Sequence, residues 1–131
     1  MPTFTKNTPN LIVSDLNRSL AFYRDVLGFS VVTTVPDKPP FVFAMLQSGA
    51  VEIFLNDAAA AIKEHPAWAG QPMVAFGHSL FIEVDGIDDL HARLVGRAPV
   101  WMPIVTQWYG MREFGVADPD GYLITFAQRV G

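Results

Sequence analysis

The stretch from 109 to 128 reads Tyr-Gly-Met-Arg-Glu-Phe-Gly-Val-Ala-Asp-Pro-Asp-Gly-Tyr-Leu-Ile-Thr-Phe-Ala-Gln. Its centre, Asp118-Pro-Asp-Gly121, predicts a tight reversal, because proline presets φ and glycine accepts positive φ. Both arms are rich in aromatic and β-branched residues, so the stretch predicts a β-hairpin. Alternate residues of a strand point to opposite faces, which places Thr125 among small and apolar neighbours on one face. Thr125 is therefore a candidate site residue.

The composition is that of a folded globular protein, and it restricts the classes of partner. The chain has 131 residues, of which 50% are hydrophobic and 17% charged, so it is long enough for about one domain with a real core. The net charge is -4 and lysine and arginine form no cluster, which disfavours nucleic acid and anionic membranes as partners. Cysteine is absent, which excludes disulfides and thiolate metal sites. With no signal-like N-terminal stretch and no apolar run of about 18 residues, a cytoplasmic protein is expected.

The first half of the chain predicts one helix and four strands. Leu16, Leu20, Tyr23 and Leu27 recur at helical spacing after a capping Ser14 or Asp15, and Gly28 ends this helix near residue 27. Short apolar or β-branched runs bounded by proline and glycine predict strands at about 8–13, 29–35, 41–47 and 51–56.

The second half repeats this order after a short helix at 57–65 and a connector that ends at 77. It predicts a strand at 80–84, a helix at 87–94, a strand at 100–106 and the final hairpin. A shift of about 71 residues lays Val13 on Val84 and Leu16 on Ile87. We infer a duplicated βαβββ module and an α+β fold, with a first module at 1–56, a helix and connector at 57–77 and a second module at 78–131, all in a single domain.

Two stretches give the chain a family resemblance. These are Leu11-Ile-Val-Ser-Asp-Leu-Asn-Arg-Ser-Leu-Ala-Phe-Tyr-Arg-Asp-Val-Leu-Gly-Phe29 and Arg112-Glu-Phe-Gly-Val-Ala-Asp-Pro-Asp-Gly-Tyr-Leu-Ile-Thr-Phe126. With the duplication, they resemble the vicinal oxygen chelate superfamily, which includes glyoxalase I, bleomycin resistance proteins and extradiol dioxygenases. The resemblance implies a cupped mixed sheet built from the two modules, a ligand pocket enclosed by the two cups, and a homodimer.

The resemblance also implies where a metal would bind. Family enzymes place His and Glu ligands on the first and last strand of each module, and these positions are Thr8, Glu52, Ser79 and Thr125 here. One carboxylate and three hydroxyls suit zinc, iron or nickel poorly. We therefore expect no metal and no cofactor. His78 lies beside Ser79, but strand alternation turns it to the other face unless a bulge rotates it.

The predicted pocket has a mixed polar and aromatic lining. Strand alternation places eight candidates on the cup side: Thr8, Asn10, Glu52, Phe54, Ser79, Phe81, Glu83 and Thr125. Five further aromatic residues are candidate stacking walls: Phe43, Trp68, Trp101, Trp108 and Tyr109. The opposite faces are uniformly apolar and should pack on the helices: Leu11, Val13, Ile53, Leu80, Ile82 and Val84. Aromatic rings beside carboxylates, among which Glu113 is a further candidate, suit a planar or cationic small molecule.

Three functions remain open from the sequence. The first is a metal-free protein that binds a cationic or aromatic compound such as an antibiotic, since Trp108-Tyr-Gly-Met-Arg-Glu-Phe114 resembles the bleomycin-resistance branch, which sequesters its ligand. The second is a glyoxalase- or dioxygenase-like enzyme, a lyase, isomerase or oxygenase with an atypical site that uses Glu52 as a base. The third is a module with a filled cup and no ligand. For Glu52 itself, the simpler interpretation is a carboxylate that binds a ligand amine or pairs with a nearby basic group.

Overall fold

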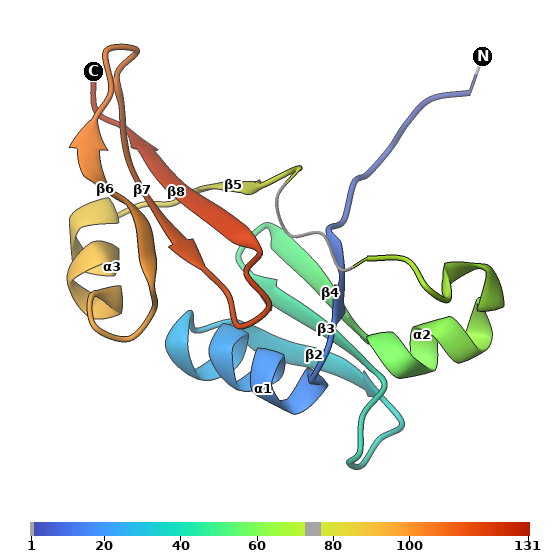
Figure 1. Cartoon of the computed structure of the whole chain (residues 1–131). Coiled ribbons are helices and arrows are strands. Elements are labelled where there is room, and N and C mark those ends of the chain that lie inside the picture. The colour runs from blue at the N-terminus through green and yellow to red at the C-terminus, as the bar shows by residue number, and fades with distance from the viewer. Residues whose placement is uncertain (1, 73–76) are drawn as a thin grey trace. The chain divides into compact units, whose positions relative to one another are not determined.

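The computed structural model describes residues 2–72 and 77–131, so part of the predicted connector (73–76) lies outside the described residues (Figure 1). Its first half contains β1 (Asn10–Val13), α1 (Leu16–Ala21), the π-helical turn η1 (Phe22–Val26), β2 (Ser30–Val35), β3 (Phe43–Ser48), β4 (Val51–Asp57), α2 (Ala58–Glu64) and the short 3-10 helix η2 (Pro66–Trp68). Its second half contains β5 (Leu80–Glu83), α3 (Ile87–Leu94), β6 (Val100–Thr106), β7 (Met111–Ala117) and β8 (Leu123–Arg129). The predicted order of elements is confirmed.

The strands form two four-stranded mixed sheets with the same topology, in the orders β1-β4-β3-β2 and β5-β8-β7-β6. β1 runs parallel to its neighbour β4, and β5 runs parallel to its neighbour β8. The remaining neighbouring pairs are antiparallel. The parallel registers match as well, with Asn10 opposite Phe54 in one sheet and Leu80 opposite Ile124 in the other. The α+β class and the βαβββ duplication are confirmed.

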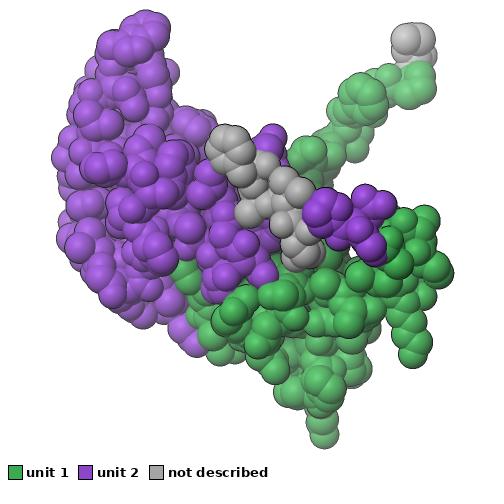
Figure 2. Space-filling model, viewed as in Figure 1, with its two compact units in different colours: residues 1–24, 28–69 green, residues 25–27, 70–131 purple. Residues whose placement is uncertain are grey.

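The chain divides into two compact units, which Figure 2 shows in separate colours. One consists of residues 1–24 and 28–69 and contains the sheet of β1 to β4 with α1 and α2. The other consists of residues 25–27 and 70–131 and contains the sheet of β5 to β8 with α3. No helix among the described residues is long and apolar enough to cross a membrane.

The first unit buries the apolar face of its sheet against α1. Sheet residues that alternate toward this face are buried: Leu11, Val13, Ala44, Leu46, Ile53 and Leu55. As predicted, the Asp15 side chain caps α1, accepting a hydrogen bond from the Arg18 amide at 3.2 Å. The regular helix ends earlier than expected, because the chain widens into η1, where two consecutive aromatic residues, Phe22 and Tyr23, are both buried.

The second unit packs α3 on β7 and β8. Phe114 is fully buried, with its ring 5.4 Å from Phe126 and 5.0 Å, edge-on, from His91. His91 is therefore half-buried against the core rather than exposed on the helix. The Gln128 side chain accepts a hydrogen bond from the Ile87 amide at 2.9 Å, so β8 supplies the cap that Gly86 cannot.

The predicted reversal between β7 and β8 is confirmed, and a buried aspartate secures it. Asp118 Oδ1 accepts hydrogen bonds from the amides of Asp120 at 2.9 Å and Tyr122 at 2.8 Å. Gly121 has a φ of 86°, in the left-handed region that glycine adopts without strain.

Replacing Asp118 with alanine is expected to lower the free energy of unfolding by about 1–3 kcal/mol, because buried amide donors lose their acceptor. Urea unfolding followed by circular dichroism measures the change. Asp118→Asn keeps an oxygen in place and should recover at least half of the loss. Equal losses in the two variants would contradict this role of the side chain.

Candidate functional site

In each sheet, one face turns away from α1 or α3 and is here called the far face. In the second sheet, Gln128, Phe114 and Phe126 contact α3 or the core beneath it, so the residues that alternate with them lie on the far face. The far face therefore includes Glu113, Gly115, Thr125 and Ala127 from β7 and β8, and Phe81 and Glu83 from β5. The prediction that Phe81, Glu83 and Thr125 share one face is consistent with this register.

The far-face residues of the second sheet form two rows across the strands. In one row, Phe81 lies opposite Thr125, and Thr125 lies opposite Gly115. In the other, Glu83 lies opposite Ala127, and Ala127 lies opposite Glu113. Directly opposed residues on one face are close neighbours, so small residues occupy the middle of both rows. Phe81 lies at one end of the first row, and Glu83 and Glu113 lie at the two ends of the second.

Trp101 covers the end of the first row. A Cβ added to Gly115 would lie 2.4 Å from Cε2 of the Trp101 indole, which means that the ring rests directly on the glycine. Trp101 nevertheless keeps 43% of its surface exposed, and Phe81 keeps 56%. The small residues Gly115, Thr125 and Ala127 are themselves buried, so the accessible surface is that of the two rings, on which a planar molecule can stack.

Glu113 is the most deeply buried carboxylate on this face, with only 4% of its surface exposed. The Tyr109 hydroxyl donates a hydrogen bond to Glu113 Oε2 at 2.8 Å. This bond raises the pKa of Tyr109 above its ordinary value of 10.0, and burial and the negative charge of Glu113 add to the shift. The sequence-predicted candidates Tyr109 and Glu113 are thus one pair.

Replacing Glu113 with glutamine is expected to bring the pKa of Tyr109 down toward its ordinary value, because the charge that opposes phenolate formation is removed. The raised pKa means that the pair stabilises the fold below pH 10, and that this contribution is lost as the pH rises through the pKa of the folded state. Ultraviolet absorbance of the phenolate measures the titration, and Tyr109→Phe identifies its signal. An unchanged titration in Glu113→Gln would refute the coupling.

The far face of the first sheet also brings predicted residues together. The rings of Phe43 and Phe54 lie 5.3 Å apart on neighbouring strands. Thr8 donates a hydrogen bond to Glu52 Oε1 at 3.2 Å, so these two candidates are neighbours. The fifth candidate of this sheet, Asn10, accepts a hydrogen bond from the Asn56 side chain.

Glu52 has a basic partner that the sequence did not single out. Lys6 Nζ lies 2.8 Å from Glu52 Oε1, and this hydrogen bond lowers the pKa of Glu52 below its ordinary value of 4.5. Burial opposes the shift, whereas the Thr8 hydroxyl and the charge of Lys6 reinforce it. A carboxylate whose pKa is lowered is a weaker general base, which disfavours the catalytic role considered for Glu52. The simpler interpretation, pairing with a basic group, fits the geometry.

The side chains at the metal-ligand positions of the family do not fit a metal ion. Glu52 supplies the only carboxylate among the four, and Lys6 and Thr8 already contact it. Thr8, Ser79 and Thr125 offer neutral hydroxyls, which are weak ligands for zinc or iron. Within the described part of the chain, no group of three or more His, Asp or Glu side chains is placed to hold a metal. His78 lies with its ring 5.9 Å from that of Tyr122.

The remaining candidates, Trp68, Trp108 and Ser79, lie outside the strands. Trp68 stacks on His65, with ring centroids 4.7 Å apart, on η2 of the first unit. Trp108 is 93% exposed at the turn between β6 and β7, where its ring meets that of Tyr109 edge-on. Ser79 is exposed and directly precedes β5.

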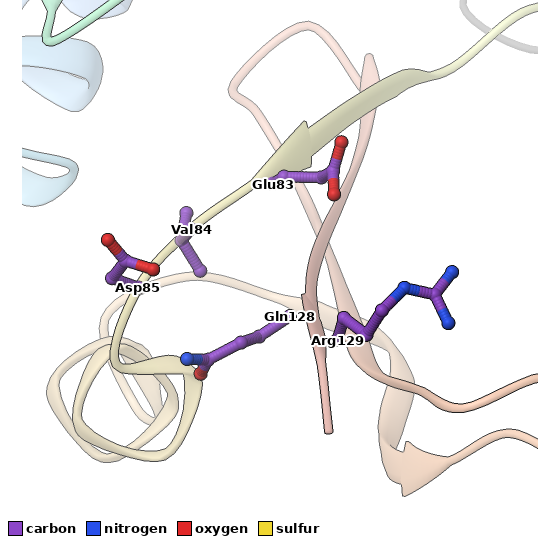
Figure 3. Close-up of a pocket in the computed structure, with 5 residues that line it drawn as sticks. All are labelled: Glu83, Val84, Asp85, Gln128 and Arg129. Atoms are coloured by element: carbon purple, nitrogen blue, oxygen red, sulfur yellow. The ribbon is translucent and has the colours of Figure 1, made fainter. Parts of the chain in front are cut away.

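A shallow pocket of about 290 Å³ lies where β5 and β8 end, lined by Glu83, Val84, Asp85, Gln128 and Arg129 (Figure 3). Figure 3 shows the Glu83 and Arg129 side chains projecting to the same side, whereas Gln128 extends toward the start of α3. Of the lining residues, only Glu83 was a sequence candidate. This pocket is polar and open, and it contains no aromatic side chain.

Sequence reasoning missed two residues that shape these surfaces, Lys6 and Gly115. Lys6 alternates with Thr8 and Asn10, so extending the strand pattern two residues toward the N-terminus would have placed it beside Glu52. A glycine inside a β-branched and aromatic strand often marks a close approach, and this signal would have pointed to Gly115. Nothing in the spacing, however, indicated that Trp101 is the residue that approaches.

Two matching βαβββ units, each with a polar and aromatic far face, define a class of small paired-module proteins. The chain belongs to the Glyoxalase/Bleomycin resistance protein/Dioxygenase superfamily, whose family profile matches residues 6–126.

Known relatives agree with this membership. The chain is 33% identical to the bleomycin resistance protein of Geobacillus stearothermophilus over 133 aligned residues, which cover 95% of this chain and 97% of that protein. Among solved structures, it is similar to a protein of unknown function from Agrobacterium tumefaciens str. C58, with a TM-score of 0.79, 22% identity and coverage of 99% and 98% of the two chains. It is also similar to TnmS3, an antibiotic binding protein from Streptomyces sp. CB03234, with a TM-score of 0.73, 21% identity and 98% coverage of both chains. These two likenesses show a shared fold.

Proposed function

We propose that this protein binds a small cationic or aromatic compound, such as an antibiotic, and that it does so without a metal ion and without turnover. The far face of the second sheet is the observation that supports this most strongly. There the exposed rings of Phe81 and Trp101 flank small residues, and the carboxylates of Glu83 and Glu113 lie in the neighbouring row. Rings attract planar groups, and carboxylates nearby favour a positive charge.

The relatives support the same class of ligand. The bleomycin resistance protein of Geobacillus stearothermophilus is 33% identical over nearly the full length of both chains. We therefore choose bleomycin as the first ligand to test. The unfavourable donor set at Thr8, Glu52, Ser79 and Thr125 supports binding without a metal, and the lowered pKa of Glu52 supports binding without acid–base catalysis.

Thermal unfolding in the presence of bleomycin tests the proposal. A ligand that binds the folded state stabilises it by about 2.7 kcal/mol at a hundredfold excess over Kd, which raises Tm by several degrees for a chain of this size. We expect a rise in Tm that depends on bleomycin concentration. If neither bleomycin nor the planar cation ethidium shifts Tm at millimolar concentration, the proposed function is wrong, and a module without a ligand is the better account.

We also infer a homodimer, in keeping with the family resemblance. The edge strands β2 and β6 expose apolar side chains, among them Val32, Val35, Val100 and Val105. Exposed apolar edges of this kind favour association with another chain. Light scattering coupled to size-exclusion chromatography should give twice the chain mass of 14.4 kDa. A monomer at micromolar concentration would contradict the inference.

A further inference from the structure

The indole of Trp101 rests on Gly115, and this contact is here called the Trp101 seat. Two features on the neighbouring strands β6 and β7 form it. Along β6 and β7, Val100 lies opposite Val116, and the next paired residue, Met102, lies opposite Gly115. Trp101 is thus the additional residue of a β-bulge, with no directly opposed partner on β7. Bulges redirect side chains relative to regular alternation, so Trp101 need not follow the face of its neighbours.

The second feature is the missing side chain of Gly115. An ideal Cβ there would lie 2.4 Å from Cε2, 2.5 Å from Nε1 and 2.7 Å from Cζ2 of the Trp101 indole. Cε2 is the ring-fusion atom bonded to the other two, so the nearest approach is onto the ring face rather than its edge. The backbone of β7 therefore closes one face of the indole. Trp101 still exposes 43% of its surface, so part of the residue remains accessible to a ligand.

Gly115 is not required by its own backbone conformation, since its φ lies outside the left-handed region. The three heavy atoms nearest to the added Cβ all belong to the Trp101 side chain. The absence of a Cβ at Gly115 therefore leaves the space that the Trp101 indole occupies. A residue selected only for strand formation would be β-branched or aromatic at this position.

We propose that Gly115 is a positioning residue of the ligand site, which together with the bulge at Trp101 holds the indole flat on β7 as a stacking platform. The part of the proposal that concerns ligand rests on the proposed function above. Glu113 lies two residues from Gly115 on the same face, a separation of about 7 Å along a strand. A cation stacked on the seated indole is thus near this carboxylate, whereas an indole displaced from Gly115 is tilted away from the strand.

The test uses Gly115→Ala, Trp101→Ala and the double variant in the full chain. Gly115→Ala is expected to weaken bleomycin binding at least fivefold when Trp101 is present, and less than twofold when it is replaced by alanine. This non-additivity distinguishes positioning through the indole from a direct or merely structural role of Gly115. Equal losses in both backgrounds would overturn the proposal. The double variant has room for the new methyl group, so it provides a folded comparison if the single variant unfolds.

A second measurement needs no ligand. In a chain with Trp68→Phe and Trp108→Phe, Trp101 is the sole tryptophan, and acrylamide quenching reports its exposure. Gly115→Ala should raise the quenching constant at least 1.5-fold as the indole leaves the strand. An unchanged quenching constant would refute the seat. If the seat is confirmed but the parent protein does not bind bleomycin, the proposed function fails and the positioning of Trp101 stands.

Discussion

Replacing Phe114 with alanine is expected to destabilise the second unit by about 3–5 kcal/mol. Phe114 is fully buried, and its ring contacts His91 on α3 and Phe126 on β8. Truncation removes the apolar area that joins the helix to the sheet and leaves a cavity that a closely packed core fills only in part. Urea unfolding followed by circular dichroism measures the loss.

Phe81→Ala is the matched control, because it makes the same chemical change on the opposite face of the same sheet. Phe81 is 56% exposed, so its replacement should change the free energy of unfolding by no more than about 0.5 kcal/mol. The comparison tests which face is the core. Similar losses from Phe81→Ala and Phe114→Ala would mean that the far face is packed rather than available to a ligand.

Replacing Trp101 with alanine is expected to weaken bleomycin binding by about thirtyfold, or roughly 2 kcal/mol, because aromatic anchors dominate small binding surfaces. Stability should also fall, by about 1–2 kcal/mol, because more than half of the Trp101 surface is buried, but the core is untouched and the variant should fold. Isothermal titration calorimetry measures the affinity, and thermal unfolding confirms that the variant is folded.

Trp108→Ala is the corresponding control. Trp108 is 93% exposed at the turn before β7 and touches the edge of the Tyr109 ring. It has neither a glycine seat nor a strand beneath it, so its loss should weaken binding less than threefold. A larger loss of affinity from Trp108→Ala than from Trp101→Ala would show that the ligand binds at the turn between β6 and β7 instead.

Local chemistry made much of the fold predictable. The bounds of α3 and β6 agree with the sequence patterns because apolar spacing and the surrounding polar residues identify both elements. The reversal at Asp118 follows from residues within the turn itself. Strand alternation also separated the buried Ile53 from the adjacent Glu52, because a sheet with one buried face imposes a period of two.

The features that were not predictable depend on contacts between distant segments or on breaks in regular geometry. Lys6 meets Glu52 across 46 positions of sequence, from a segment that precedes β1 and that the predicted strand did not include. The bulge at Trp101 breaks the alternation by which residues were assigned to faces. His91 is half-buried against Phe114, which its own helix pattern does not reveal. In each case a tertiary neighbour, rather than local sequence, decides the position of the side chain.

Calorimetric titration of bleomycin into protein stripped of metal with EDTA tests the central claim most directly, with elemental analysis of the same sample. The predicted result is saturable binding without added metal. In parallel titrations, zinc, nickel or iron(II) is added to the protein, and the bleomycin is preloaded with the same ion so that it does not remove metal from the protein. The affinity for this preloaded bleomycin should change by less than twofold when the ion is added to the protein. Binding that appears only after the protein takes up a stoichiometric metal ion would contradict the account.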